Sequence, residues 1–70
     1  MNKNALFISS DTAHRVGKSV SKHLPNVEVY VSAWYKRGNL EGYCIRIVTN
    51  GETSIMSEDM AKLYVNEGKW

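Results

Sequence analysis

The sequence predicts a single small two-layer α+β domain, with element order βαβββα and helices packed on one face of a mostly antiparallel sheet. Three observations lead to this fold class. They are an apolar stripe at helical spacing in residues 12–24, apolar alternation in residues 27–35, and an Asn-Gly pair at residues 50–51. The chain has 70 residues, which is enough for one domain, and we place its limits at residues 1–70.

An apolar run, a capping pair and a proline predict the first elements. Residues 4–9 are a short strand candidate, and Ser10 or Asp11 can cap a helix over residues 12–24. Pro25 ends this helix, because the residue before a proline avoids helical backbone angles. Strand, helix and following strand predict a right-handed crossover with the first two strands parallel. The apolar stripe of the helix, on which a glycine permits close packing, consists of Ala13, Val16, Gly17, Val20 and Leu24.

The alternating stretch at residues 27–35 predicts a strand that places small apolar side chains on one face and large aromatic side chains on the other. A three-residue turn at residues 38–40 then returns the chain antiparallel. We favour the register that keeps apolar residues on one face. On the core face this register pairs Ala33 with Ile45 and Val31 with Ile47. On the opposite face it pairs Trp34 with Cys44, Ser32 with Arg46, and Tyr30 with Val48.

Asn50-Gly51 is the strongest local signal, because both residues tolerate the positive φ angles of a two-residue type I′ turn. Pairing Thr49 with Glu52 across this turn extends the sheet by one strand. The same register places Met56 beside Ile45, Ile55 beside Arg46, and Thr53 beside Val48. Ser57 can cap a last helix that has acidic residues in its first turn. The expected inner edge and end of that helix are Met60, Leu63, Tyr64 and Gly68.

The composition is that of an ordinary globular domain. Apolar residues make up 43% and charged residues 23%, which opposes disorder. No apolar run reaches the roughly 18 residues that span a bilayer, and the first apolar stretch is too short for a signal peptide. The single cysteine, Cys44, cannot form an intrachain disulfide, and we expect a cytoplasmic protein. No paired Cys or His motif is present, so we predict neither a metal site nor a cofactor.

The aromatic side of the predicted hairpin is the candidate binding surface. Aromatic and arginine side chains dominate the energy of many protein interfaces, and here they lie on a sheet face expected to meet water. We therefore predict a non-catalytic protein, a small regulator or inhibitor that docks on a larger cytoplasmic protein through this face and the hairpin tip. The predicted partner-binding residues are Tyr30, Trp34, Lys36, Arg37, Arg46 and Ile55.

Three alternatives remain at this point. A small nucleic-acid-binding module would stack bases on the same aromatic residues and hold phosphates with a basic helix side formed by Arg15, Lys18 and Lys22. A structural alternative is that this face is covered by a helix or closes a homodimer. Catalysis by Ser9, Ser10, Asp11 and His14 is disfavoured, because helix capping already accounts for Ser10 and Asp11.

Overall fold

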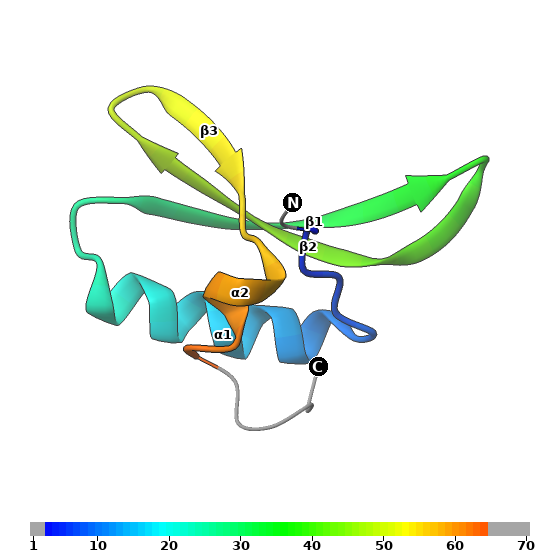
Figure 1. Cartoon of the computed structure of the whole chain (residues 1–70), viewed down its shortest axis with the longest axis horizontal. Helices are drawn as coiled ribbons and strands as arrows, with labels where there is room; N and C mark the ends of the chain where they lie inside the picture. Colours follow the sequence, from blue (N-terminus) through cyan, green and yellow to red (C-terminus); the bar gives the residue numbers. More distant parts are fainter. Residues whose placement is uncertain (1–2, 65–70) are drawn as a thin grey trace.

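The computed structural model describes residues 3–64. Its elements in chain order are α1 (Ser10–His23), β1 (Glu28–Lys36), β2 (Asn39–Thr49), β3 (Glu52–Ile55) and α2 (Glu58–Ala61). The strands form an antiparallel three-stranded sheet in the order β1-β2-β3. Both helices lie on the same side of this sheet, and α1 packs along β1 and β2 (Figure 1). The predicted α+β class, with helices on one face, is confirmed.

The N-terminal segment does not form the predicted strand at residues 4–9. It makes only isolated antiparallel bridges, one between Asn4 and Ser57 and one between Phe7 and Tyr43. Phe7 exchanges two backbone hydrogen bonds with Tyr43 of β2, at 2.8 and 2.9 Å. Because β3 occupies the same edge of β2 from Arg46 onward, the segment can reach β2 at this one position only. The predicted parallel pairing of the first two strands is therefore wrong.

Helix α1 begins two residues earlier than predicted. Its N-cap is Ser9, whose hydroxyl accepts a hydrogen bond from the backbone N–H of Thr12, in place of the expected Ser10 or Asp11. The apolar stripe was predicted correctly, since Ala13, Val16, Gly17 and Val20 are all buried. The helix ends at His23, with Leu24 as its C-cap, one residue before the predicted end and just before Pro25.

The β1–β2 hairpin closes through a shorter turn than predicted. Lys36 pairs with Asn39, so the turn consists of Arg37 and Gly38, which have φ angles of 53° and 80°. These angles fit a type I′ turn, whose twist matches that of the strands it joins. The predicted three-residue turn at residues 38–40 is wrong. Arg37 adopts a left-handed conformation, which is uncommon for a residue other than glycine, and this allows the shorter turn.

The register of the hairpin consequently differs from the predicted one by two residues. A bulge at Glu41 separates the Tyr35–Leu40 pair from the Trp34–Gly42 pair. A shift by an even number keeps every side chain on its predicted face but changes its neighbours. The observed pairs are Ala33 with Tyr43, Val31 with Ile45, Ser32 with Cys44, and Tyr30 with Arg46.

The second hairpin follows the prediction. Asn50 and Gly51 form the turn, with φ angles of 52° and 80°, and Thr49 pairs with Glu52. Ile55 lies opposite Arg46 and Thr53 opposite Val48, and the N–H of Met56 bonds to the carbonyl of Ile45. Ser57 caps α2 by accepting from the N–H of Met60, also as predicted.

Helix α2 is a single turn, and only part of its predicted inner edge contacts the core. Met60 and Tyr64 pack against the core, whereas Leu63 is 79% exposed, so its predicted inward position is wrong. The chain tightens after Ala61 into turns, which rotates Leu63 away from the sheet. The predicted stop at Gly68 lies outside the described residues. The core between helices and sheet is built around Phe7, Val20, Ile45 and Met56.

Candidate functional site

The sheet surface opposite the helices, which we call the outer face, carries most of the predicted binding residues. Figure 1 shows that neither helix crosses to this side. Strand alternation places the following residues on it: Glu28, Tyr30, Ser32, Trp34, Gly42, Cys44, Arg46, Val48, Thr53 and Ile55. The prediction that the helices leave the aromatic side of the hairpin uncovered is met within residues 3–64.

One row of side chains crosses all three strands of the outer face. Tyr30 on β1 lies opposite Arg46 on β2, and Arg46 lies opposite Ile55 on β3. The Arg46 Nε donates to the Ser32 hydroxyl at 3.1 Å, which holds the arginine along the sheet. Tyr30 is 51% exposed, while Arg46 and Ile55 are half-buried. An aromatic, a cationic and an aliphatic group therefore form a continuous row that a partner can contact.

The phenol of Tyr30 is tied to its neighbour on the same strand. Its hydroxyl donates a 2.8 Å hydrogen bond to the Glu28 carboxylate, two residues away and on the same face. This hydrogen bond, and then the negative charge of Glu28, raises the pKa of Tyr30 above its usual value of 10.0. The hydrogen bond thus holds the phenol beside Glu28 on β1, the edge strand of the sheet.

Trp34 and Cys44 occupy the middle of the outer face and are less accessible than the sequence suggested. Cys44 is fully buried even though its strand position faces away from the helices. Its direct partner is Ser32, and Trp34 and Arg46 are its diagonal and same-strand neighbours. Trp34 itself is half-buried and lies opposite Gly42, which has no side chain to displace the indole. Trp34 and Cys44 are therefore apolar diagonal neighbours on the outer face.

The tip of the β1–β2 hairpin, green in Figure 1, projects beyond the N-terminal end of α1. Lys36 and Arg37 are exposed there, as predicted for the hairpin tip. Two apolar residues near the tip were missed by the sequence reasoning, namely Tyr35 at 63% and Leu40 at 48% exposure. They occupy positions on the helix side of the sheet, but α1 begins at Ser10 and runs away from the tip, so it does not cover them. The alternation of residues 27–35 places Tyr35 on this side of the sheet, but the sequence does not show how far the helix covers the sheet.

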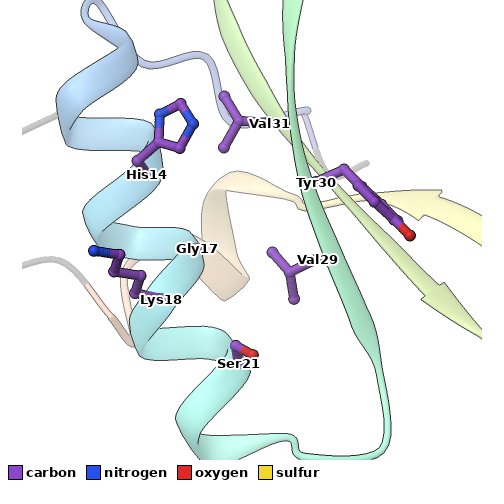
Figure 2. A pocket seen from close by; sticks show the side chains of 7 residues that line it. All are labelled: His14, Gly17, Lys18, Ser21, Val29, Tyr30 and Val31. Atoms are coloured by element: carbon purple, nitrogen blue, oxygen red, sulfur yellow. The ribbon is translucent and has the colours of Figure 1, made fainter.

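The basic residues of α1 lie on the other layer. Arg15, Lys18 and Lys22 are all exposed, and they are separated from the outer face by the sheet. A groove of about 360 Å³ opens between α1 and β1, lined by His14, Gly17, Lys18, Ser21, Val29, Tyr30 and Val31. In Figure 2, Val29 and Val31 point from β1 toward the helix, and Tyr30 leaves the strand on the opposite side. No local sequence pattern predicts this groove, which depends on how helix and strand pack against each other.

The residues that could suggest catalysis are engaged in local structure. The Ser9 hydroxyl caps α1 and donates to the Thr12 hydroxyl at 2.9 Å. The Nδ1 atoms of His14 and His23 lie 2.7 and 2.8 Å from the carbonyls of Ser10 and Ser19, one helical turn earlier. Within residues 3–64, no group of three or more His, Cys, Asp or Glu side chains could hold a metal ion.

Across the described part of the chain, no helix combines the length and the apolar character needed to cross a bilayer. No protein-family model matches this sequence, and neither a curated protein nor a solved structure matches it.

Proposed function

We propose that this chain is a non-catalytic binding protein, a small regulator or inhibitor that docks on a larger cytoplasmic protein through its outer face and the β1–β2 tip. The observation that carries the proposal is the row formed by Tyr30, Arg46 and Ile55 across three strands. Tyrosine and arginine are enriched among residues that dominate interface energy, and fixed side chains lose little entropy on binding. Arg46 is fixed by Ser32, and Tyr30 by Glu28.

The outer face also has the layout of an interface. Near its centre Cys44 is buried and Trp34 is half-buried. Charged side chains lie around it, with Glu28 at one end and Lys36 and Arg37 at the tip. An apolar centre with a polar rim is typical of surfaces that bind other proteins.

The test is capture of a partner from nuclease-treated lysate, followed by measurement of its affinity for variants. We expect Tyr30→Ala and Trp34→Ala each to weaken binding by at least about tenfold, because each removes an aromatic anchor. Leu63→Ala is the matched control, since it truncates an exposed apolar residue away from the outer face. Trp34 is half-buried, so the folded state of each variant is checked by circular dichroism. Unchanged affinity in folded Tyr30→Ala and Trp34→Ala would contradict the proposal.

A second function is supported by the exposed basic residues of α1. Arg15, Lys18 and Lys22 follow one another at spacings of three and four, so they share one side of the helix. Such a stripe could contact the phosphates of a nucleic acid. Binding of a labelled oligonucleotide would then fall steeply with salt, and replacing the three residues with Gln would reduce that slope. Absence of binding at low salt would remove this alternative.

A further inference from the structure

The outward edge of β1 carries unpaired backbone groups. Tyr43 directs both its N–H and its carbonyl to Phe7, and the Ile45 carbonyl accepts from Met56, so these residues of β2 face away from β1. Their partners on β1, Ala33 and Val31, therefore direct their own backbone groups away from β2. Within residues 3–64, no segment pairs with this side of β1. An exposed strand edge of nine residues is a template for another strand.

The helix side of the same edge is incompletely covered. Ala33 is exposed, Tyr35 is 63% exposed, and the groove beside Val29 is open. The groove lies near the start of β1 and the exposed Tyr35 near its end. A two-fold axis through the middle of β1 would place the end of β1 in one copy beside the start of β1 in the other.

We propose that two copies of this chain pair through their β1 edges, antiparallel, about a two-fold axis at Ser32, to form a continuous six-stranded sheet. This inference goes beyond the proposed function and does not depend on it. The pairs across the axis are Glu28 with Lys36, Val29 with Tyr35, Tyr30 with Trp34, Val31 with Ala33, and Ser32 with its own copy. Each of the first four pairs occurs twice in the dimer.

The side chains in this register are complementary. Opposite charges meet at both ends of the shared strand pair, where Glu28 faces Lys36. On the outer face, Tyr30 of one copy lies beside Trp34 of the other, and aromatic cross-strand pairs stabilise antiparallel sheets. A shift by two residues in one direction would set Glu28 against Trp34, and in the other Lys36 against Tyr30. Both shifts lose the charge pairing.

The backbone geometry agrees with the same register. The residues whose backbone groups face the free edge alternate along the strand, so they are Val29, Val31, Ala33 and Tyr35. In the proposed pairing they meet only one another, as Val29 with Tyr35 and Val31 with Ala33. Every hydrogen-bonding position is therefore matched, and Ser32 falls at a non-hydrogen-bonded position on the axis.

The partner's Tyr35 also accounts for the open groove. Opposite Val29 and on the helix side of the sheet, its ring would lie beside Gly17, Lys18 and Ser21, which line the groove. Gly17 has no side chain to close this space, and Figure 2 shows Val29 at the groove floor. The exposed ring of one copy and the open groove of the other are thus complementary, which favours a second copy over an unrelated peptide.

The first test is the mass of the full chain in solution, measured by light scattering and sedimentation over a wide concentration range. We expect a dimer of twice the chain mass of 7.9 kDa. Lys36→Glu should raise the dimer dissociation constant about tenfold, since it places like charges at both ends of the pairing. The double variant Glu28→Lys/Lys36→Glu should recover the original value. A monomer at every concentration would overturn the proposal, and so would a dimer whose dissociation constant neither variant changes.

The second test cross-links the two copies through a disulfide at position 32, on the proposed two-fold axis. Ser32→Cys is made together with Cys44→Ala, because Ser32 is opposite Cys44 within the same chain. Non-hydrogen-bonded partners lie about 4.5 Å apart between Cα atoms, within the range that a disulfide spans. Mild oxidation should give a covalent dimer in high yield, whereas the control Thr53→Cys/Cys44→Ala should stay monomeric on a denaturing gel. Equal cross-linking of the two variants would contradict a two-fold axis at Ser32.

Discussion

Tyr30 and Glu28 show how spacing along a strand sets the chemistry of a single residue. Two residues apart, they share the outer face, and the phenol donates to the carboxylate at 2.8 Å. The acceptor stabilises the neutral phenol, so the pKa of Tyr30 is raised. A raised pKa in the folded state means that this interaction contributes to stability below pH 10 and is lost as pH rises through the pKa of the folded protein.

We predict that Glu28→Gln lowers the pKa of Tyr30 toward its usual value of 10.0, because the charge that opposes ionisation is removed. The measurement is the ultraviolet absorbance of tyrosinate during alkaline titration, resolved by comparison with a Tyr30→Phe variant. Glu52→Gln, which removes an exposed carboxylate from β3, is the control and should leave the titration unchanged. An identical titration for Glu28→Gln and the unaltered protein would show that the bond is not maintained in solution.

Two buried glycines differ in what a methyl group would meet. At Gly42, an added Cβ would lie 2.8 Å from the backbone oxygen of Phe7, which is fixed by its hydrogen bond with Tyr43. At Gly17 the nearest atom is the Val29 Cγ1 at 3.4 Å, an ordinary contact. Only Gly42 is therefore required by close approach of the backbone.

Gly42→Ala should lower the free energy of unfolding by about 1–3 kcal/mol, since backbone must move to admit the methyl group. Gly17→Ala should raise it by up to about 1 kcal/mol, because alanine favours the helix more than glycine does. Urea denaturation, followed by circular dichroism, measures the free energy of unfolding of both variants. If the two variants changed stability in the same direction, the packing described for one of these glycines would be wrong.

At the scale of elements, the two hairpin turns have the same geometry but different residues. Asn50-Gly51 is the combination that most favours a type I′ turn, whereas Arg37-Gly38 places a long side chain at a φ of 53°. Arginine at positive φ costs energy that asparagine largely avoids. The β1–β2 turn thus retains a strained residue that is also a candidate partner contact, and function is one reason to keep such a residue.

Arg37→Asn should therefore stabilise the fold by about 0.5–1 kcal/mol and, if the tip contacts the partner, weaken binding. Thermal denaturation gives the first value, and titration of the captured partner gives the second. Asn50→Ala is the complementary change, and it should destabilise the β2–β3 hairpin by a similar amount. A less stable Arg37→Asn would indicate that the arginine side chain makes a stabilising contact that outweighs its backbone strain.

For the molecule as a whole, the N-terminal segment joins the two ends of the described chain. The Ala5 N–H donates to the Met56 carbonyl, and the Lys3 carbonyl accepts from the N–H of Glu58, the first residue of α2. Phe7 is fully buried in the core, directly before α1. A domain of 70 residues has roughly 4–10 kcal/mol of stability at typical values per residue, so one large core side chain is a substantial part of it.

Phe7→Ala should lower the free energy of unfolding by about 3–5 kcal/mol, because a buried ring is replaced by a cavity. Ile8→Ala is the matched control: Ile8 is the next residue along the chain but is 83% exposed, so the expected change is within about 0.5 kcal/mol. Chemical denaturation compares the two. Equal effects would mean that the segment is not packed against the core.

The elements with local signals were predicted well. The stripe of α1 followed from its 3.6-residue period, and the β2–β3 hairpin from Asn50-Gly51, because each depends on residues close together in sequence. Alternation likewise assigned Tyr30, Trp34, Arg46 and Ile55 to one face, and a register shift of two residues could not change that.

The sequence alone therefore determined the α+β class, the helix stripe and the residues of the outer face. Only the tertiary structure decided which side chains are neighbours on that face, because the bulge at Glu41 brings Tyr30 opposite Arg46. It also decided that the first segment pairs with β2 at Phe7 alone, and that the helices leave Tyr35 exposed. These outcomes depend on competition for one strand edge and on the lengths of packed elements, which no local pattern specifies.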